Sequence, residues 1–304
     1  MKIIYFGTPT FASVVLDFLI QSGVEVLAIV TKPDKPRGRS GKPAFSAVKQ
    51  LATEKYPTIP LYQPDKASTT SFEEEIARYG ADLFVVVAYG EIMKQPLLDL
   101  PKRGCINLHA SLLPKYRGAA PIQFALLDGA KQTGVTIIEM VLKMDAGPML
   151  AQEKIPIPKE MNSGELEEAL CDLGGKTLLR VIKTYPKQKV EQDPRGATYV
   201  QKITPDMAAI DWGKPAETLH NQIRAFSPRP GAWCEVEIDG QTKRLKIFKA
   251  EVSAETEEVF SKEKWSIPCG EGALSLLEVQ LEGKKKLPIG DFARGLNQPP
   301  HIKK

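Results

Sequence analysis

The chain has 304 residues, of which 42% are apolar and 26% charged, and its formal charge is +4; these values are those of a soluble globular protein of about two domains. No apolar run approaches the roughly 20 residues of a membrane helix, and the N-terminal run is too short for a signal peptide, so no membrane partner is expected. Four widely separated cysteines and three histidines predict no metal site and indicate free thiols in a reducing cytoplasm.

Short apolar segments alternate with amphipathic ones in the first part of the chain. This alternation predicts an α/β domain over residues 1–188, built on a Rossmann-like, mainly parallel sheet. The continuous apolar run ADLFVVVAYG (81–90) is typical of a strand at the centre of a covered sheet. The other expected strands are 3–7, 24–31, 105–110 and 134–141, and the expected helices are 8–21, 45–55, 71–79 and 163–183.

The composition changes after this domain. Residues 189–207 are polar and contain proline, which predicts a linker. Beyond it, residues 208–304 read as a small β-barrel or sandwich, with an OB-like barrel as one form, because short alternating strands are separated by turn residues such as Asp239-Gly240. The expected strands are 233–239, 244–252, 273–280 and an edge near 287–289.

Two polar side chains share one face of the expected strand 105–110. Side chains alternate along a strand, so Asn107 and His109 point to the same side, at the carboxyl end where ligands bind in open α/β sheets. Asp145, in a turn after the next strand, is a second candidate. Taken singly, a histidine on a strand is more often a core residue and an aspartate before Ala-Gly-Pro a turn residue, so the pattern alone leaves both interpretations open.

The segment FGTPTF (6–11) stands where a dinucleotide-binding protein carries its phosphate loop. It has no G-x-G-x-x-G pattern, and Pro9 occupies a position that such a loop needs for a small residue. A nicotinamide-dependent dehydrogenase is therefore a poor interpretation.

A basic loop follows the second expected strand. Residues 32–42 (KPDKPRGRSGK) contain five basic residues and one acid, an excess as large as the net charge of the whole chain. A charge run is usually an ordinary solvated surface. This loop also mixes glycines with arginines on the ligand side of the sheet, so it could follow the phosphates of an RNA into the site.

The motifs around these residues resemble those of the folate-dependent formyltransferases. The resemblance is carried by NLHASLLPKYRGAAPI (107–122) and TGVTIIEMVLKMDAGPML (133–150). FGTPTFA (6–12) and IRAFSPRPGAW (223–233) resemble those members that formylate initiator methionyl-tRNA, and the resemblance covers essentially the whole chain. It implies transfer of a formyl group from the reduced folate 10-formyltetrahydrofolate to the methionine amino group for translation initiation. We expect a monomeric cytoplasmic enzyme.

The resemblance also implies roles for individual residues. Asn107 would donate a hydrogen bond to the tetrahedral oxyanion, protonated His109 would add a charge-assisted one, and Asp145 would favour charged His109 and accept the amine proton. Arg117 is either a ligand for an anion or a solvated loop cation. The implied folate-binding residues are Val86, Val87, Ala88, Tyr89, Gly90, Ser111, Leu112, Leu113 and Pro114. The implied tRNA contacts are Lys35, Arg37, Arg39 and Lys42. Our own hypothesis is that the second domain holds the acceptor stem, although its lysine clusters are equally typical of an ordinary surface.

Two rival functions remain. The same machinery could use another acceptor, such as glycinamide ribonucleotide or an amino sugar nucleotide; the β-domain disfavours the first, but only the basic loop and the 223–233 motif disfavour the second. The chain could also be a non-catalytic RNA-binding protein on an inactive scaffold. A binding module has no need of Asn107, His109 and Asp145 together, which disfavours this rival.

Overall fold

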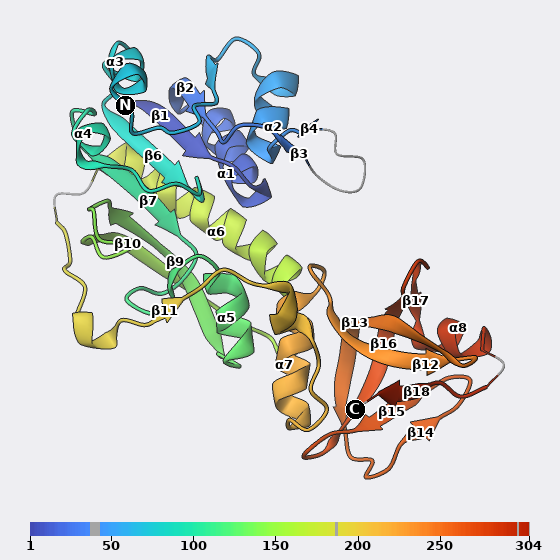
Figure 1. Cartoon of the computed structure of the whole chain (residues 1–304). Coiled ribbons are helices and arrows are strands. Elements are labelled where there is room, and N and C mark those ends of the chain that lie inside the picture. The colour runs from blue at the N-terminus through green and yellow to red at the C-terminus, as the bar shows by residue number, and fades with distance from the viewer. Residues whose placement is uncertain (37–42, 186–187, 297, 304) are drawn as a thin grey trace. The chain divides into compact units, whose positions relative to one another are not determined.

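The structure is a computed structural model that describes residues 1–36, 43–185, 188–296 and 298–303 (Figure 1). The chain forms two compact units. The first contains Met1–Gly118, Gln132–Ile155 and Glu167–Val200, and the second contains Ala119–Lys131, Pro156–Leu166 and Gln201–Lys304. The sequence predicts two domains that are each continuous in the chain, up to residue 188 and from residue 208. The second unit of the structure instead contains three separate segments of the chain.

A mainly parallel sheet forms the centre of the first unit. Among the described residues it has seven strands in the order β10-β9-β7-β6-β1-β2-β5. The pairs β1–β2, β1–β6, β6–β7 and β2–β5 are parallel, and β9 runs antiparallel to β7. The strands are β1 (Lys2–Gly7), β2 (Glu25–Val30), β5 (Leu61–Tyr62), β6 (Leu83–Val87), β7 (Cys105–His109), β9 (Gln132–Glu139) and β10 (Met149–Pro156).

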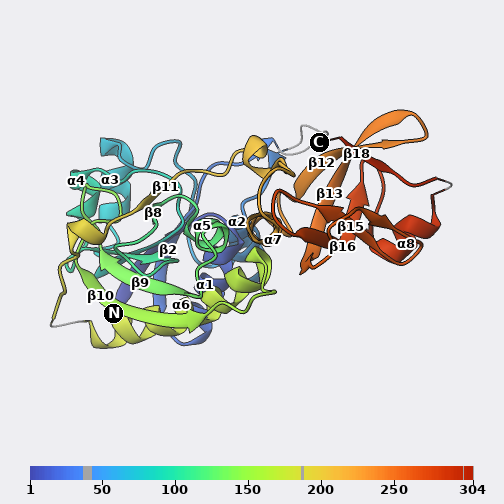
Figure 2. The same cartoon turned by 90° about the horizontal axis from the view of Figure 1, so that it is seen from below.

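Helices cover the sheet, which explains the continuous apolar strands. Every residue of β6 is buried, as the sequence predicts for a central strand. Two adjacent glycines let α6 approach its neighbours, because a Cβ at Gly174 would lie 2.9 Å from Leu108 and one at Gly175 2.9 Å from Phe18 of α1. Figure 2 shows α6 beside α1. The helices are α1 (Thr10–Gln21), α2 (Ala47–Lys55), α3 (Thr70–Ala77), α4 (Gln95–Leu98) and α6 (Ser163–Thr184), whose first residues belong to the second unit.

Three short elements complete the first unit. The two-residue strands β3 (Lys35–Pro36) and β4 (Pro43–Ala44) pair with each other on either side of the undescribed part of the basic loop. The strand β8 (Arg117–Gly118) pairs in parallel with β11 (Tyr199–Val200), which follows the short 3-10 helix η1 (Pro194–Gly196).

The second unit is a curled antiparallel sheet, consistent with the barrel-like domain expected from the sequence. The strand order is β14-β15-β16-β13-β12-β18, with β17 beside β16. Asp239 and Gly240 have φ of 51° and 72°, as the predicted Asp-Gly hairpin turn requires. The strands are β12 (Ala232–Ile238), β13 (Gln241–Ser253), β14 (Val259–Phe260), β15 (Trp265–Pro268), β16 (Ala273–Leu281), β17 (Lys286–Pro288) and β18 (His301–Lys303).

Helices pack on this second sheet and were not predicted. The core contains Trp265, whose ring stacks on Phe292 with centroids 6.2 Å apart, and Phe226 at the end of α7. The helical segments are α5 (Pro121–Leu127), η2 (Pro205–Ala208), α7 (Ala216–Phe226) and α8 (Ile289–Arg294). Within the described part of the chain, no helix has the length and apolarity needed to cross a bilayer.

Candidate active site

Asn107 and His109 lie on β7 and point to one face of the sheet. The Cα of Asn107 is paired with Val86 of β6 and Ile138 of β9, and His109 is paired with Thr136 of β9. His109 is buried, with 6% of its surface exposed, whereas Asn107 is half-buried. No described residue hydrogen-bonds the side-chain amide of Asn107, so that group is available to a ligand.

The His109 ring lies between a main-chain carbonyl and a carboxylate. Nε2 is 2.8 Å from the carbonyl oxygen of Tyr116. Because a carbonyl oxygen only accepts hydrogen bonds, Nε2 carries a proton. Nδ1 is 3.7 Å from Oδ2 of Asp145, which is beyond hydrogen-bond length but close enough for an ion pair when the ring is charged. The structure thus brings Asp145 beside His109.

The turn that carries Asp145 is held by its main chain and its carboxylate. Asp145 has φ of 49°, in the left-handed region, and its Oδ2 accepts a hydrogen bond of 2.8 Å from the Gly118 amide. Position 147 requires glycine, because a Cβ there would lie 1.8 Å from the carbonyl oxygen of Glu139. Gln192 donates 2.8 and 2.7 Å hydrogen bonds to the carbonyls of Asp145 and Gly147.

The Ser111–Pro114 loop is fixed by Thr136. The Thr136 hydroxyl donates to the Ser111 carbonyl at 2.6 Å and accepts from the Leu113 amide at 3.1 Å. Ser111 and Leu113 are buried, and the peptide bond between Leu113 and Pro114 is cis. Of the four predicted folate-binding residues in this loop, Leu112 and Pro114 are therefore the two that are partly exposed.

The other predicted folate segment lies at the carboxyl end of β6. Val86 and Val87 are buried strand residues, and Tyr89 is buried against Phe6. Ala88 and Gly90 are exposed and have φ of 46° and 85°. Among these five predicted folate-binding residues, Ala88 and Gly90 are therefore the exposed ones.

The burial of Arg117 excludes one of the two roles expected for it. It is 2% exposed, so it is not a solvated loop cation. Its Nε and Nη2 donate to Oε1 of Gln192 at 3.2 and 2.6 Å, and its Nη1 donates to the Tyr199 hydroxyl at 3.3 Å. The guanidinium is thus bound within the protein.

The expected tRNA contacts lie mostly outside the described structure. Lys35 begins β3, whereas Arg37, Arg39 and Lys42 lie outside the described residues. In the second unit, Arg244 stacks on Trp233 at 3.8 Å, and its cross-strand neighbour is Glu235. Acidic and basic side chains therefore mix on this face of β12 and β13.

Three of the four cysteines, Cys105, Cys171 and Cys234, are buried. Burial raises the pKa of the Cys171 and Cys234 thiols to about 12, so neither is a thiolate at neutral pH. Among the described residues, no cluster of His, Cys, Asp and Glu could hold a metal ion.

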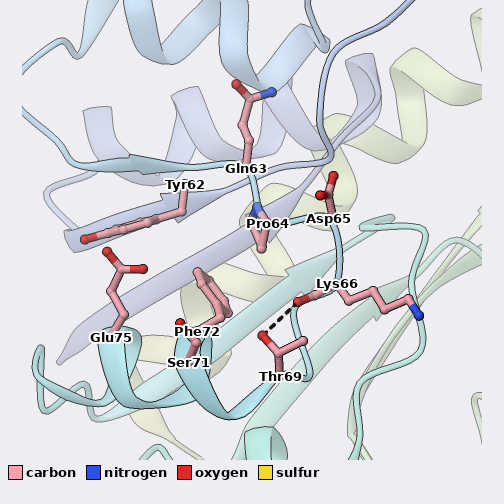
Figure 3. A pocket seen from close by; sticks show the side chains of 9 residues that line it. All are labelled: Tyr62, Gln63, Pro64, Asp65, Lys66, Thr69, Ser71, Phe72 and Glu75. Carbon is pink, nitrogen blue, oxygen red and sulfur yellow. Dashed lines mark hydrogen bonds between the residues drawn. The ribbon is translucent and has the colours of Figure 1, made fainter.

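A pocket of about 490 Å³ lies at the carboxyl end of β5 (Figure 3). Figure 3 shows Tyr62 and Pro64 on one side of it and Phe72 of α3 on the other. None of the predicted site residues lines it. β5 is four strands from β7 in the sheet, so roughly 19 Å separates these two strands. Its lining residues are Tyr62, Gln63, Pro64, Asp65, Lys66, Thr69, Ser71, Phe72 and Glu75.

Sequence reasoning missed the residues that hold the site together. Thr136 occupies an apolar strand without a distinguishing motif, and Gln192 lies in the stretch interpreted as a linker. Alternation along the strand 134–141 could have assigned Thr136 to one face of that strand, but not paired it with His109, and no sequence pattern marks Gln192.

Two protein-family models match this chain. The family model described as formyl transferase matches residues 1–182, and the model of the formyl transferase C-terminal domain matches residues 202–297. A methionyl-tRNA formyltransferase of Protochlamydia amoebophila is 49% identical over 308 aligned positions, covering 98% of this chain and 96% of the relative.

Solved structures share the fold at low sequence identity. WlaRD, a sugar 3N-formyltransferase solved with dTDP and 5-N-formyl-THF, has a TM-score of 0.66 at 19% identity and covers 94% of this chain and 99% of its own. HypX from Aquifex aeolicus, solved with tetrahydrofolic acid, has a TM-score of 0.64 at 16% identity and covers 100% of this chain and 51% of its own.

Proposed function

The chain belongs to the formyl transferase family, and from this premise we propose that it transfers the formyl group of 10-formyltetrahydrofolate to the amino group of methionine on initiator methionyl-tRNA. Membership of the family makes the chain an enzyme. The observation that carries the proposal is the approach of Asp145 to His109, 3.7 Å apart, beside the available amide of Asn107.

The proposed reaction is a direct acyl transfer. The neutral methionine amine attacks the formyl carbon, whose oxygen becomes an oxyanion, and the bond from that carbon to the folate nitrogen breaks. The amine loses one proton and the leaving folate nitrogen gains one, so protons balance. Holding both substrates in the correct orientation supplies much of the rate.

Each of the three residues has a proposed part in this step. Asn107 donates a hydrogen bond from its amide to the oxyanion. The Nδ1 proton of charged His109 reaches the same oxygen, because the 3.7 Å gap to Asp145 leaves this proton without a short internal acceptor. Asp145 accepts the amine proton at its second carboxylate oxygen, since Oδ2 is already bound by the Gly118 amide.

The folate is proposed to lie between the two exposed strand-end segments. Ala88 and Gly90 present backbone at the end of β6, and Leu112 and Pro114 present apolar surface after β7. A flat heterocycle suits a groove of backbone amides and apolar side chains. The folates named with WlaRD and HypX support a reduced folate as the co-substrate.

The acceptor is proposed from the curated relatives and the basic loop. Relatives at 38–49% identity over nearly the whole chain are named methionyl-tRNA formyltransferase, whereas the sugar-modifying neighbour is 19% identical. We propose that Lys35, Arg37, Arg39 and Lys42 bind phosphates of the acceptor arm, that the second unit holds its stem, and that the enzyme is a cytoplasmic monomer.

A formylation assay tests the function. The purified protein is incubated with 10-formyltetrahydrofolate and either methionyl initiator tRNA or an amino sugar nucleotide, beside Asp145→Asn and the matched surface variant Asp172→Asn. We expect formylated tRNA from wild type, a fall in kcat of about 100-fold or more for Asp145→Asn, and a change within about twofold for Asp172→Asn. Formylation of the sugar nucleotide alone would overturn the acceptor, and wild-type kcat in Asp145→Asn would remove Asp145 from the mechanism.

A further inference from the structure

Gln192 joins two segments of the site that are far apart in the sequence. It is 8% exposed and lies between α6 and η1. Its Nε2 donates to the carbonyl oxygens of Asp145 and Gly147, and its Oε1 accepts two hydrogen bonds from Arg117. A glutamine amide has two N–H donors and one oxygen with two lone pairs, so all four of its hydrogen-bonding positions are used.

The chemistry of the partners fixes the orientation of this amide. Arg117 only donates hydrogen bonds, and the carbonyls of Asp145 and Gly147 only accept them. Oε1 of Gln192 must therefore face Arg117, and Nε2 must face the turn that carries Asp145. Glutamate at this position could still pair with Arg117, but its carboxylate has no proton to donate to the turn.

Three consecutive residues connect Gln192 to both partners of the His109–Asp145 contact. The Tyr116 carbonyl accepts the hydrogen bond of His109 Nε2 at 2.8 Å, and the Gly118 amide donates to Asp145 Oδ2 at 2.8 Å. Between them, the Arg117 guanidinium is bound by Gln192. Gln192 thus holds the Asp145 turn from one side and the segment that touches both catalytic candidates from the other.

We propose that Gln192 is a positioning residue that sets the place of the Asp145 carboxylate relative to His109; this inference rests on the proposed function. It touches neither reacting group directly. Loss of its two N–H donors releases the main chain of the Asp145 turn, which is bound there through the carbonyls of Asp145 and Gly147. A displacement of about 1 Å at a reacting group can lower the rate about 100-fold.

The test compares two glutamines of equal burial. Gln222 is also 8% exposed and its Nε2 also donates to two carbonyls, those of Met207 and Ala209, in the second unit. Gln192→Met and Gln222→Met each remove the amide while keeping the side-chain length. Gln192→Glu keeps an acceptor for Arg117 and removes the donors to the turn. For each folded variant, kcat, KM for the folate, KM for the tRNA and Tm are measured.

We expect Gln192→Met and Gln192→Glu to lose about 10- to 100-fold in kcat, with both KM values within about threefold of wild type. We expect Gln222→Met to lower Tm but leave kcat within about twofold of wild type, because its carbonyl partners lie outside the site. Gln192→Glu also serves if Gln192→Met does not fold, since it retains the pairing of Arg117.

Wild-type kcat in Gln192→Glu would overturn the inference, because it would show that pairing Arg117 is the whole role of Gln192. Equal losses of kcat in Gln192→Met and Gln222→Met would overturn it as well, by assigning the loss to stability. Failure of the proposed function gives a different result, since wild type would then not formylate the tRNA at all.

Discussion

The two units each bury a histidine, an arginine and a glutamine, but the chain assembles the two sets differently. In the first unit, His109, Arg117 and Gln192 come from three separate segments. In the second unit all three residues lie on α7: His220, Gln222 and Arg224. A carboxylate lies near each histidine, Asp145 at 3.7 Å and Glu160 at 3.6 Å.

The set on α7 supports packing. Arg224 donates to carbonyls of Met161 and Leu126, and burial lowers its pKa. His220 has its Nδ1 buried without a hydrogen-bond partner among the described residues, and Glu160 is 56% exposed to solvent. These bonds join α7 to neighbouring segments of the same unit.

The comparison shows that a buried histidine with a nearby acid does not by itself define an active site. The first set differs because Asp145 is 15% exposed, bound by the Gly118 amide and placed at the carboxyl end of the sheet, where a ligand can enter. The two sets have the same residue types and are both buried, so it is their position in the fold that distinguishes them.

The largest expected effect separates the two histidines. We expect His109→Ala to lower kcat by about 100- to 10,000-fold, because it removes the cationic hydrogen-bond donor, with folate affinity nearly intact. We expect His220→Ala to change kcat by no more than about threefold, since no catalytic role depends on it. Steady-state formylation and folate titration measure both. Comparable losses of kcat in the two variants would show that His109 and His220 do not differ in catalytic role.

A smaller effect separates two glycines. Gly118 has φ of 119°, and a Cβ there would lie 2.2 Å from the carbonyl oxygen of Val200, whereas Gly240 has φ of 72° and nothing within 4 Å. We expect Gly118→Ala to displace β8 from β11 and to lower kcat about 10-fold through the Asp145 contact. Gly240→Ala should cost about 1 kcal/mol of stability through backbone strain alone.

Thermal melting and kinetics on the same samples check this pair. Gly240→Ala is the control for backbone strain, because its turn joins β12 to β13 far in sequence from the site residues. If Gly118→Ala keeps wild-type kcat while its Tm falls, the segment 116–118 is not what holds Asp145 in place.

The sequence predicted much of the frame that carries the site. The buried run at β6, the alternation of Asn107 and His109 and the Asp-Gly turn depend on local periodicity and turn chemistry, which a single sequence records. The placement of Asp145 beside His109 depends on a pairing between strands, so only the family resemblance could suggest it. The roles of the site residues remain predictions.

Other features were hidden for physical reasons. The polar alternation of β10 at a sheet edge and the short α5 give weak periodic signals, and the antiparallel pairing of β9 with β7 is set by tertiary packing. Gln192 lies in irregular chain, where burial follows from contacts with residues 45 and 75 positions away. Because the segment around Gln192 has the composition of a linker, the burial of this residue was not predicted.

The smallest expected effect is a pH dependence of stability that arises from His220 in the second unit. Burial lowers the pKa of His220 below its ordinary value of 6.5, although the nearby Glu160 opposes the shift. As pH falls through 6.5, the unfolded chain binds a proton at this residue and the folded chain does not. The contribution of His220 to folding is therefore complete above this pH and is lost as pH falls toward the folded pKa.

Comparison of wild type with His220→Gln from pH 7.5 to 5.0 isolates this contribution. We expect the free energy of unfolding of wild type to fall more steeply than that of the variant over this range. Carboxylates with lowered pKa, such as Asp17, contribute the same slope to both proteins and mainly at lower pH. The kcat profiles of the two proteins should coincide, because His220 has no part in the proposed reaction. Parallel stability curves would mean that His220 takes up its proton in the folded state as readily as in the unfolded one, and the buried histidine of the second unit would then resemble a solvated one.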